Sequence, residues 1–230
     1  MPSPKAKKAA RSAKSKIAYT APERLEKIFA ALDTLFPQAT CALRHENPFQ
    51  LLVSTILSAQ CTDERENKVT PDLFRKYPTP QDFAALRQPI LETEIRSTGF
   101  FRNKAKNLIG AAKRIVADFG GQIPRTMDEM LTLPGVARKT ANVVLGTAFG
   151  LPTGVVVDTH VFRIAGRLKL SKQKTPEKVE QDLMKLVPQE RWITFGHQVI
   201  WFGRKICQAR KPLCAECPLE PLCDSPDKTV

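Results

Sequence analysis

The chain has 230 residues, which is enough for one large domain or two modest ones. Lys and Arg outnumber Asp and Glu by 36 to 23, and the resulting net charge of +13 indicates a polyanionic partner. No stretch is apolar enough for a membrane span or a signal peptide, so we expect a soluble protein of the cytoplasm.

The first 19 residues form a basic segment with little apolar content. No acidic residue precedes Glu23, whereas basic residues recur throughout: Lys5, Lys7, Lys8, Arg11, Lys14 and Lys16. A segment of this composition buries too little apolar surface to fold, so we interpret residues 1–19 as a disordered basic tail. The tail either touches phosphates non-specifically or is simply solvated, and the composition favours neither interpretation.

Almost every segment after Thr20 shows apolar residues at three- and four-residue spacing, the pattern of amphipathic helices. We expect helices near residues 25–35, 49–59, 90–98, 102–119, 127–131, 138–149, 159–168, 176–187 and 191–206, with shorter ones beginning near 63 and 80. The β-branched run at 155–157 is expected to be an extended crossing segment. No alternating strand pattern of any length occurs, so the predicted fold class is all-α.

Four of the six cysteines crowd into the C-terminal segment, with six, two and five residues between them: Cys207, Cys214, Cys217 and Cys223. Four thiolates at this spacing are typical of one metal centre, and spacing alone does not separate a tetrahedral zinc from an iron-sulfur cluster. Disulfides are the weaker interpretation because we expect a reducing compartment. Arg210 and Lys211 lie in the first gap, where their charge either meets a phosphate backbone or offsets the thiolates.

A Leu133-Pro134-Gly135 turn precedes the helix expected from Arg138. Free backbone N–H groups and the helix dipole at such a helix start favour an anion, so the turn is a candidate phosphate anchor. A plain turn between two helices has the same residues, and the turn alone does not separate the two interpretations.

Three motifs in this order resemble those of the endonuclease III family of helix-hairpin-helix DNA glycosylases. They are the hairpin at 133–135, the stretch Val157-Asp158-Thr159-His160 about twenty residues later, and the four-cysteine spacing. The resemblance spans residues 20–224 and implies a bifunctional DNA glycosylase and AP lyase of base-excision repair. It implies removal of oxidised pyrimidines through a lysine Schiff base, followed by strand nicking through β-elimination. It also implies that the four cysteines hold a 4Fe-4S cluster, while Cys41 and Cys61 are free.

By the same resemblance, Lys139 is the nucleophile that attacks the sugar C1′ and expels the damaged base. Asp158 stands where the family keeps a carboxylate that assists proton movement and stabilises positive charge on the sugar. Without the resemblance, a phosphate-binding surface lysine is the favoured interpretation of Lys139. An ordinary helix N-cap is the alternative for Asp158, and it is compatible with the catalytic role. We expect His160 to make structural hydrogen bonds, while His45 and His197 carry no signal.

The resemblance also implies contacts with duplex DNA around a flipped nucleotide. Gln60 matches the glutamine that fills the gap, and Phe100 lies at the wedge position, where an aliphatic residue is usual. Ala137 replaces the hairpin's second glycine, at a cost of about 1 kcal/mol if the backbone needs a positive φ there. The full set of expected DNA contacts is Gln60, Phe100, Leu133, Gly135, Ala137, Arg138, Arg210 and Lys211.

Because Lys139 and Asp158 must meet across a cleft, we expect two helical domains. One spans residues 41–152 and carries the helix-hairpin-helix at about 127–146. The other combines residues 20–40 with 153–230 and carries the cluster loop. The expected partner is double-stranded DNA with oxidised bases or abasic sites, which a monomer meets at the nucleoid.

Three alternatives share some of these motifs. A related adenine glycosylase lacks the nucleophilic lysine and uses a glutamate near position 55, whereas this chain has Lys139 and Thr55. A glycosylase for oxidised purines uses a lysine but usually lacks the cysteine loop. A non-catalytic DNA-binding module has the same salt-dependent affinity but does not require Lys139 together with Asp158.

Overall fold

The computed structural model describes residues 19–230 of the chain. Most of the expected disordered tail, residues 1–18, therefore lies outside the described part. Tyr19, the last residue of that expected tail, is described, and its hydroxyl donates a hydrogen bond to the Asp224 carboxylate at 2.7 Å. The described chain thus begins attached to the C-terminal segment.

Residues 19–230 form helices joined by short connections and contain no β-strand, which confirms the all-α prediction for this part of the chain. The α-helices are α1 (Pro22–Leu35), α2 (Pro48–Leu57), α3 (Asp63–Lys76), α4 (Pro80–Ala85), α5 (Gln88–Glu94), α6 (Phe101–Phe119), α7 (Met127–Leu131), α8 (Arg138–Phe149), α9 (Thr159–Arg167), α10 (Pro176–Leu186) and α11 (Trp192–Lys205). Short 3₁₀ helices are η3 (Arg96–Thr98), η4 (Gln189–Arg191), η5 (Cys214–Glu216) and η6 (Glu220–Leu222). None of these helices is both long and apolar enough to cross a membrane.

Side-chain caps and glycines set several helix ends where the sequence predicts them. Asn47 caps α2 by accepting a hydrogen bond from the Gln50 N–H, and Thr126 caps α7 in the same way. Gly120 and Gly150 adopt left-handed conformations, with φ of 59° and 67°, at the ends of α6 and α8.

Several helix lengths differ from the prediction; the helix expected at 90–98, for example, is α5 (Gln88–Glu94) followed by η3. Helix α2 ends at Leu57 rather than near residue 59, because the chain turns there and Gln60 adopts a φ of 53°. Helix α3 runs for 14 residues, where a shorter helix was expected, and includes Pro71. Acidic residues fill its first turn and basic residues its last, so both ends complement the helix dipole and favour the longer helix.

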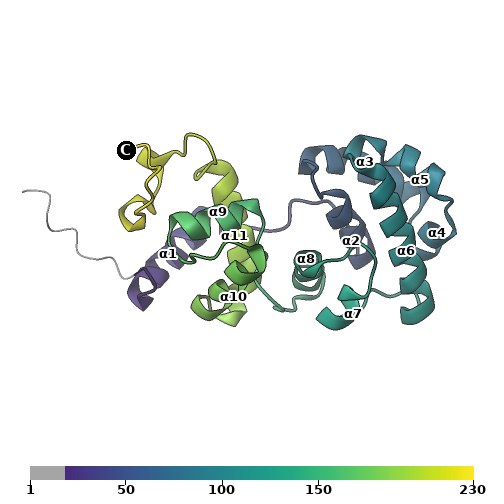
Figure 1. Ribbon diagram of the computed structural model, residues 1–230, viewed down its shortest axis with the longest axis horizontal. Coiled ribbons are helices and arrows are strands. Elements are labelled where there is room, and N and C mark those ends of the chain that lie inside the picture. The colour runs from purple at the N-terminus through teal and green to yellow at the C-terminus, as the bar shows by residue number, and fades with distance from the viewer. Residues whose placement is uncertain (1–18) are drawn as a thin grey trace, which may run out of the picture.

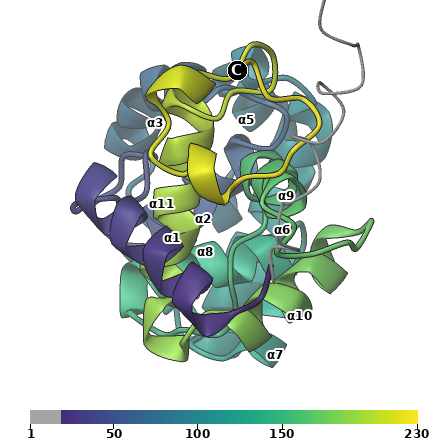
Figure 2. The same cartoon turned by 90° about the vertical axis from the view of Figure 1, so that its left-hand side faces the viewer.

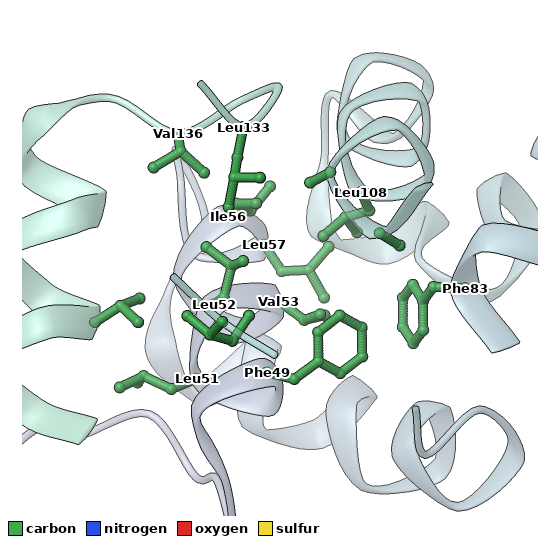
Figure 3. Close-up of a cluster of buried hydrophobic side chains, with 14 of the residues drawn as sticks. Phe49, Leu51, Leu52, Val53, Ile56, Leu57, Phe83, Leu108, Leu133 and Val136 are labelled. Atoms are coloured by element: carbon green, nitrogen blue, oxygen red, sulfur yellow. The ribbon is translucent and has the colours of Figure 1, made fainter. Parts of the chain in front are cut away.

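The first hydrophobic core is built around α2, where every residue from Phe49 to Leu57 is buried. Figure 3 shows Phe49 facing Phe83 and Leu57 directed toward Leu108 of α6. The rings of Phe49 and Phe83 meet edge to face, with centroids 5.2 Å apart. Helix α2 is therefore held on all sides by the helices around it.

The second hydrophobic core joins α1, α9, α10 and α11, and its fully buried side chains include Ile28, Leu183 and Phe202. In Figure 1 these helices lie on one side of the molecule and α2 to α7 on the other, with α8 between them. Figure 2 views the second core's end, where α1 and the C-terminal segment lie nearest the reader. Each core thus gathers its own set of helices.

The extended segment at 155–157 connects the two cores, as the sequence predicts. Val156 packs in the first core, whereas Val155 and Val157 pack in the second. Successive side chains of an extended chain point to opposite sides, so one run of valines serves both cores. Asp158 follows directly and is thereby fixed at the junction.

Candidate active site

Lys139 and Asp158 line one cavity, to which both cores contribute. Lys139 is the second residue of α8, and Asp158 immediately precedes α9. The remaining walls are Thr40, Cys41, Ala42, Leu43, Thr55, Ser58, Asp63, Val143, Val156, His197, Ile200, Trp201 and Arg204. The fold thus brings together the two side chains that the sequence singles out for chemistry.

The half-buried Asp158 side chain is oriented by the helix that it caps. Its Oδ1 accepts hydrogen bonds from the backbone N–H groups of His160 and Val161, both at 2.8 Å. The His160 ring lies 3.2 Å from Arg163 Nη2, in keeping with a structural role. Burial lowers the pKa of His160 although the Asp158 carboxylate acts in the opposite direction, so the ring is neutral at pH 7.

The start of α8, by contrast, is held from outside the helix. Ala137 provides no side-chain cap. Instead, Arg138 Nε donates to both carboxylate oxygens of Glu180 at 3.1 and 2.9 Å, and Asn142 Nδ2 donates to one of them at 2.8 Å. Glu180 belongs to α10 and is only 5% exposed. This buried network ties the helix that carries Lys139 to the second core.

The segment that leads from α8 toward Asp158 joins the same network. The Thr153 hydroxyl donates to Asn142 Oδ1 at 2.9 Å, and its carbonyl accepts from Arg138 Nη2 at 3.4 Å. A Cβ atom on Gly154 would lie 2.0 Å from Glu180 Oε1, so only glycine fits. Arg138, which the sequence marks as a DNA contact, thus directs its guanidinium at Glu180 in this structure.

Several further cavity residues carried no signal in the sequence. Arg204 and Asp63 form an ion pair at 2.6 Å, which joins α11 to α3 across the cavity wall. His197 lies 3.3 Å from the Thr147 hydroxyl, and burial lowers its pKa, so it is neutral at pH 7. No local motif marks these residues, because only the packing of α11 against α8 and α3 brings them to the cavity.

The hairpin between α7 and α8 is fixed against α6. Gly135 has a φ of 77°, and a Cβ atom there would lie 2.7 Å from the Cβ of Asn107. The turn therefore needs glycine both for its conformation and for its close approach. Leu133 is 2% exposed and packs in the first core, so only its backbone remains available to a phosphate.

Ala137 fits the hairpin without the second glycine. Its φ of −97° and ψ of 169° lie in the extended region, which any residue adopts without strain. The cost of about 1 kcal/mol that a positive φ would impose therefore does not arise.

Gln60 and Phe100 both combine an exposed side chain with an uncommon backbone. Their φ angles are 53° and 47°, in the left-handed region that non-glycine residues rarely adopt. The Phe100 side chain is 69% exposed, which is unusual for so large an apolar group. Strained and exposed residues of this kind mark candidate contact sites.

All four C-terminal cysteines line a second cavity, beneath the C-terminal segment, and none forms a disulfide. Burial raises the pKa of Cys217 to about 11, and the other three cysteines add to that effect. Arg167 Nη1 donates to the Cys207 sulfur at 3.3 Å. Apolar side chains, Leu168, Phe202 and Leu219 among them, complete the wall.

This donor set fits a metal centre. Among residues 19–230, no three His, Cys, Asp or Glu side chains are already arranged around a single ion. Four free thiols nevertheless face one cavity, and if ionised together they require a cationic centre to offset their mutual repulsion. Cys41 and Cys61 lie apart from this cavity and are also free.

The loop between Cys207 and Cys214 presents Arg210 and Lys211 as exposed side chains. Its base is fixed by Arg167, whose Nη1 donates to the Gln208 carbonyl at 2.7 Å. Its far end is fixed by the Leu213 N–H, which donates to the Ile206 carbonyl at 3.0 Å. The loop thus keeps its shape while its positive charges face outward.

The model of the HhH-GPD superfamily of base excision DNA repair proteins matches residues 53–189 of this chain. That range includes the hairpin, Lys139 and Asp158.

Endonuclease III of Synechocystis is 56% identical to this chain over 203 residues, which cover 88% of this chain and 93% of the relative. A solved non-covalent endonuclease III–DNA complex matches with a TM-score of 0.85 and 45% identity, over 88% of this chain and 95% of that one. A trapped endonuclease III–DNA covalent intermediate, an estranged-adenine complex, matches with the same TM-score, identity and coverage.

Proposed function

The chain belongs to the endonuclease III family of the HhH-GPD superfamily, and from this premise we propose how its residues act on DNA. It is a DNA glycosylase and AP lyase of base-excision repair. The observation that carries the assignment of residues is that Lys139 and Asp158 line one cavity.

Lys139 is the nucleophile in this proposal. Its amine attacks C1′ of the damaged nucleoside, the bond to the base breaks, and the open sugar remains attached to Nζ as a Schiff base. β-Elimination then nicks the strand. The side chain is exposed beside the cavity in the free protein, where it can meet a nucleotide that enters the cavity. The solved covalent endonuclease III–DNA intermediate supports a covalent route.

Asp158 acts on the same sugar from the opposite wall. Its carboxylate stabilises positive charge that develops on the sugar as the base leaves, and it assists proton movement. The two backbone N–H groups that bond Oδ1 hold the carboxylate in a fixed orientation, so little reorganisation accompanies the reaction.

DNA is held by the hairpin and by the exposed residues on either side of the cavity. The hairpin backbone up to the start of α8 anchors a phosphate, with Gly135 allowing the turn and Ala137 continuing it. Gln60 fills the gap left by the flipped nucleotide and Phe100 wedges between bases. Oxidised pyrimidines in duplex DNA, and abasic sites, are the substrates.

A 4Fe-4S cluster is proposed on Cys207, Cys214, Cys217 and Cys223. When bound, the cluster ties the C-terminal segment together and fixes the loop that carries Arg210 and Lys211, which then meets the DNA backbone. Arg167 donates to the Cys207 sulfur and to the loop backbone, so it compensates thiolate charge and supports the loop at the same time.

The two cores are proposed to define two domains, residues 41–152 and residues 20–40 plus 153–230. Helix packing supports this division, because each core draws almost all of its members from one of these sets. We propose that the enzyme acts as a monomer on the nucleoid DNA of the cytoplasm, since one chain supplies both walls of the cavity.

Borohydride trapping tests the function and its nucleophile together. A duplex oligonucleotide with one thymine glycol is incubated with the enzyme and reduced during turnover. The wild-type chain is expected to become covalently linked to the lesion strand, and Lys139→Gln is expected to bind the duplex without linking. Linkage by Lys139→Gln at the wild-type rate would place the nucleophile elsewhere, and no linkage by the wild type would refute the lyase assignment.

A further inference from the structure

Lys104 is a buried cation whose ammonium group has no role in the chemistry proposed above. It lies in the first turn of α6 and is 5% exposed. Its Nζ donates one hydrogen bond to the Leu57 carbonyl and another to the Thr98 carbonyl, both at 2.8 Å. The salt bridges among residues 19–230 do not include it.

Both carbonyls belong to the last residue of a helix. Leu57 ends α2 and Thr98 ends η3. The Cys61 N–H, which would bond the Leu57 carbonyl if α2 continued, donates instead to the Ser58 carbonyl at 3.0 Å. The ammonium group therefore satisfies a carbonyl that the helix leaves open, and its charge complements the negative end of the α2 dipole.

The two helix ends lead directly into two exposed residues of the candidate DNA face that have positive φ, Gln60 and Phe100. Gln60 is three residues beyond Leu57, and Phe100 is two residues beyond Thr98. Phe100 is also tied to Lys104 through the backbone, because the Lys104 N–H donates to the Phe100 carbonyl at 3.1 Å. One lysine thus contacts the base of both loops.

We propose that Lys104 is a positioning residue that fixes the distance between the Gln60 loop and the Phe100 loop, so that both side chains enter a DNA duplex together. This inference rests on the function proposed above. The packing of Leu57 against Leu108 already aligns α2 with α6 (Figure 3). The hydrogen bonds of Lys104 extend that alignment to the helix ends that precede Gln60 and Phe100.

The ammonium group is costly to bury, which argues for a positional role over simple filling of space. Burial lowers the pKa of Lys104, although nearby Cys61 raises it. An apolar side chain would fill the same volume but would leave two buried carbonyls without these donors. Only a side chain with several N–H donors joins two carbonyls at one point.

The test compares Lys104→Met with Lys113→Met, which removes the same charge from an exposed position on α6. Excision is measured on a thymine glycol duplex in single turnover. Base unstacking is measured from the fluorescence of 2-aminopurine placed opposite an abasic site, with every protein carrying Lys139→Gln so that no strand is cut. Lys104→Met is expected to slow excision about 10- to 100-fold, as misplaced groups do, and to lose most of the fluorescence rise. Lys113→Met is expected to match the wild type in both.

Two further measurements separate positioning from a general loss of structure. Borohydride trapping on a single strand with a preformed abasic site needs no wedge, so Lys104→Met is expected to retain the wild-type rate there. In a Phe100→Ala background, the loss caused by Lys104→Met is expected to shrink several-fold, because coupled residues are not additive. Equal losses on both substrates, or fully additive losses, would overturn the proposal.

Other outcomes are equally decisive. Wild-type excision and fluorescence in a folded Lys104→Met protein would overturn the positioning role while leaving the proposed function intact. An inactive wild-type chain would remove both. If Lys104→Met does not fold, Lys104→Arg keeps a buried cation but changes the donor geometry, and the same selective loss on duplex substrate is expected at smaller size. A Lys104→Arg protein with no duplex-specific loss would overturn the proposal.

Discussion

The two walls of the cavity are built in opposite ways. On the α9 wall, Asp158 fixes itself, because the carboxylate that faces the cavity also caps its own helix at 2.8 Å from two N–H groups. On the α8 wall, the Lys139 side chain makes no hydrogen bond or ion pair with residues 19–230 that would hold the helix start. Arg138, Asn142 and the buried Glu180 hold that start from the second core.

On the α8 wall, the proposed chemistry and the stability of the helix start therefore depend on different residues. On the α9 wall, both depend on Asp158. A change at Lys139 should remove chemistry alone, and we expect Lys139→Gln to alter the free energy of unfolding by less than about 0.5 kcal/mol. A change at Asp158 should affect both unless the replacement keeps the cap.

Asp158→Asn and Asp158→Ala break the α9 wall in two steps. Both remove the carboxylate charge, and we expect either to slow base excision by about 100-fold or more. Asn retains the cap, whereas Ala should also lower the free energy of unfolding by about 1 kcal/mol. Single-turnover excision and urea denaturation measure the two effects separately. Equal stability of the two variants would show that the cap contributes little.

Glu66 is a second buried carboxylate, but it lacks the hydrogen-bond partners that Glu180 has. It is 0% exposed, and neither carboxylate oxygen accepts a hydrogen bond within the described chain. The neighbouring Ser54 and Thr70 hydroxyls donate to backbone carbonyls instead. Burial raises the pKa of Glu66 to about 7, and the Asp63 carboxylate adds to the rise, whereas the Ser54 and Thr70 hydroxyls lie close enough to offset it in part.

The raised pKa gives Glu66 a defined pH signature. The folded chain holds this proton more tightly than the unfolded chain, so stability should fall as pH rises from about 4.5 to about 7 and then stay low. Glu66→Gln should remove that fall and stabilise the protein at pH 8 by no more than about 3 kcal/mol. Urea denaturation at pH 4.5 and pH 8 tests this, and a gain of equal size at both pH values would contradict it.

Glu180→Gln should have the opposite sign and a smaller size. It weakens the bonds from Arg138 and Asn142 at a site where Arg138 is 40% exposed, so we expect a loss of about 1–2 kcal/mol. Excision should slow several-fold because the start of α8 is less constrained, whereas Asp158 stays capped. Arg138→Gln is the matched variant, because it removes the charge of the partner of Glu180. Full activity in both variants would show that the network does not position Lys139.

Ala137→Gly should have the smallest effect. Ala137 has an extended backbone, so restoring glycine relieves no strain. We expect changes within about 0.5 kcal/mol in the free energy of unfolding and an unchanged Kd for duplex DNA. A large gain in DNA affinity from this glycine would indicate that the hairpin rearranges on binding.

Local patterns were enough to predict most of the fold. Helix periodicity, the Asn47 and Thr126 caps and the glycines after α6 and α8 depend on neighbouring residues, and the structure bears them out. Helix α3 is longer than predicted: it continues through Pro71, and Leu73 and Phe74 beyond the proline pack in the first core, a tertiary contact that no local pattern shows.

The candidate site shows the same difference between residues in local motifs and residues placed by long-range packing. Lys139 and Asp158 were selected because each lies in a recognisable local motif; the structure shows that they line one cavity, and their catalytic roles stay predictions. His197, Arg204 and Glu180 reach the site only through packing between distant helices, so no spacing in the sequence marks them. The ion pair of Arg138 with the buried Glu180 could not be predicted for the same reason, and the DNA contact expected of Arg138 stays a prediction.

The three valines before Asp158 make the cavity intolerant of length changes. Because their side chains alternate between the two cores, deleting one residue would exchange every side chain's face and direct Val156 to the wrong core. A shift of the chain in the opposite direction is excluded at Gly154, because it would place a residue with a Cβ atom against Glu180, where only glycine fits. The register of this segment in the two cores therefore fixes the distance between Asp158 and Lys139.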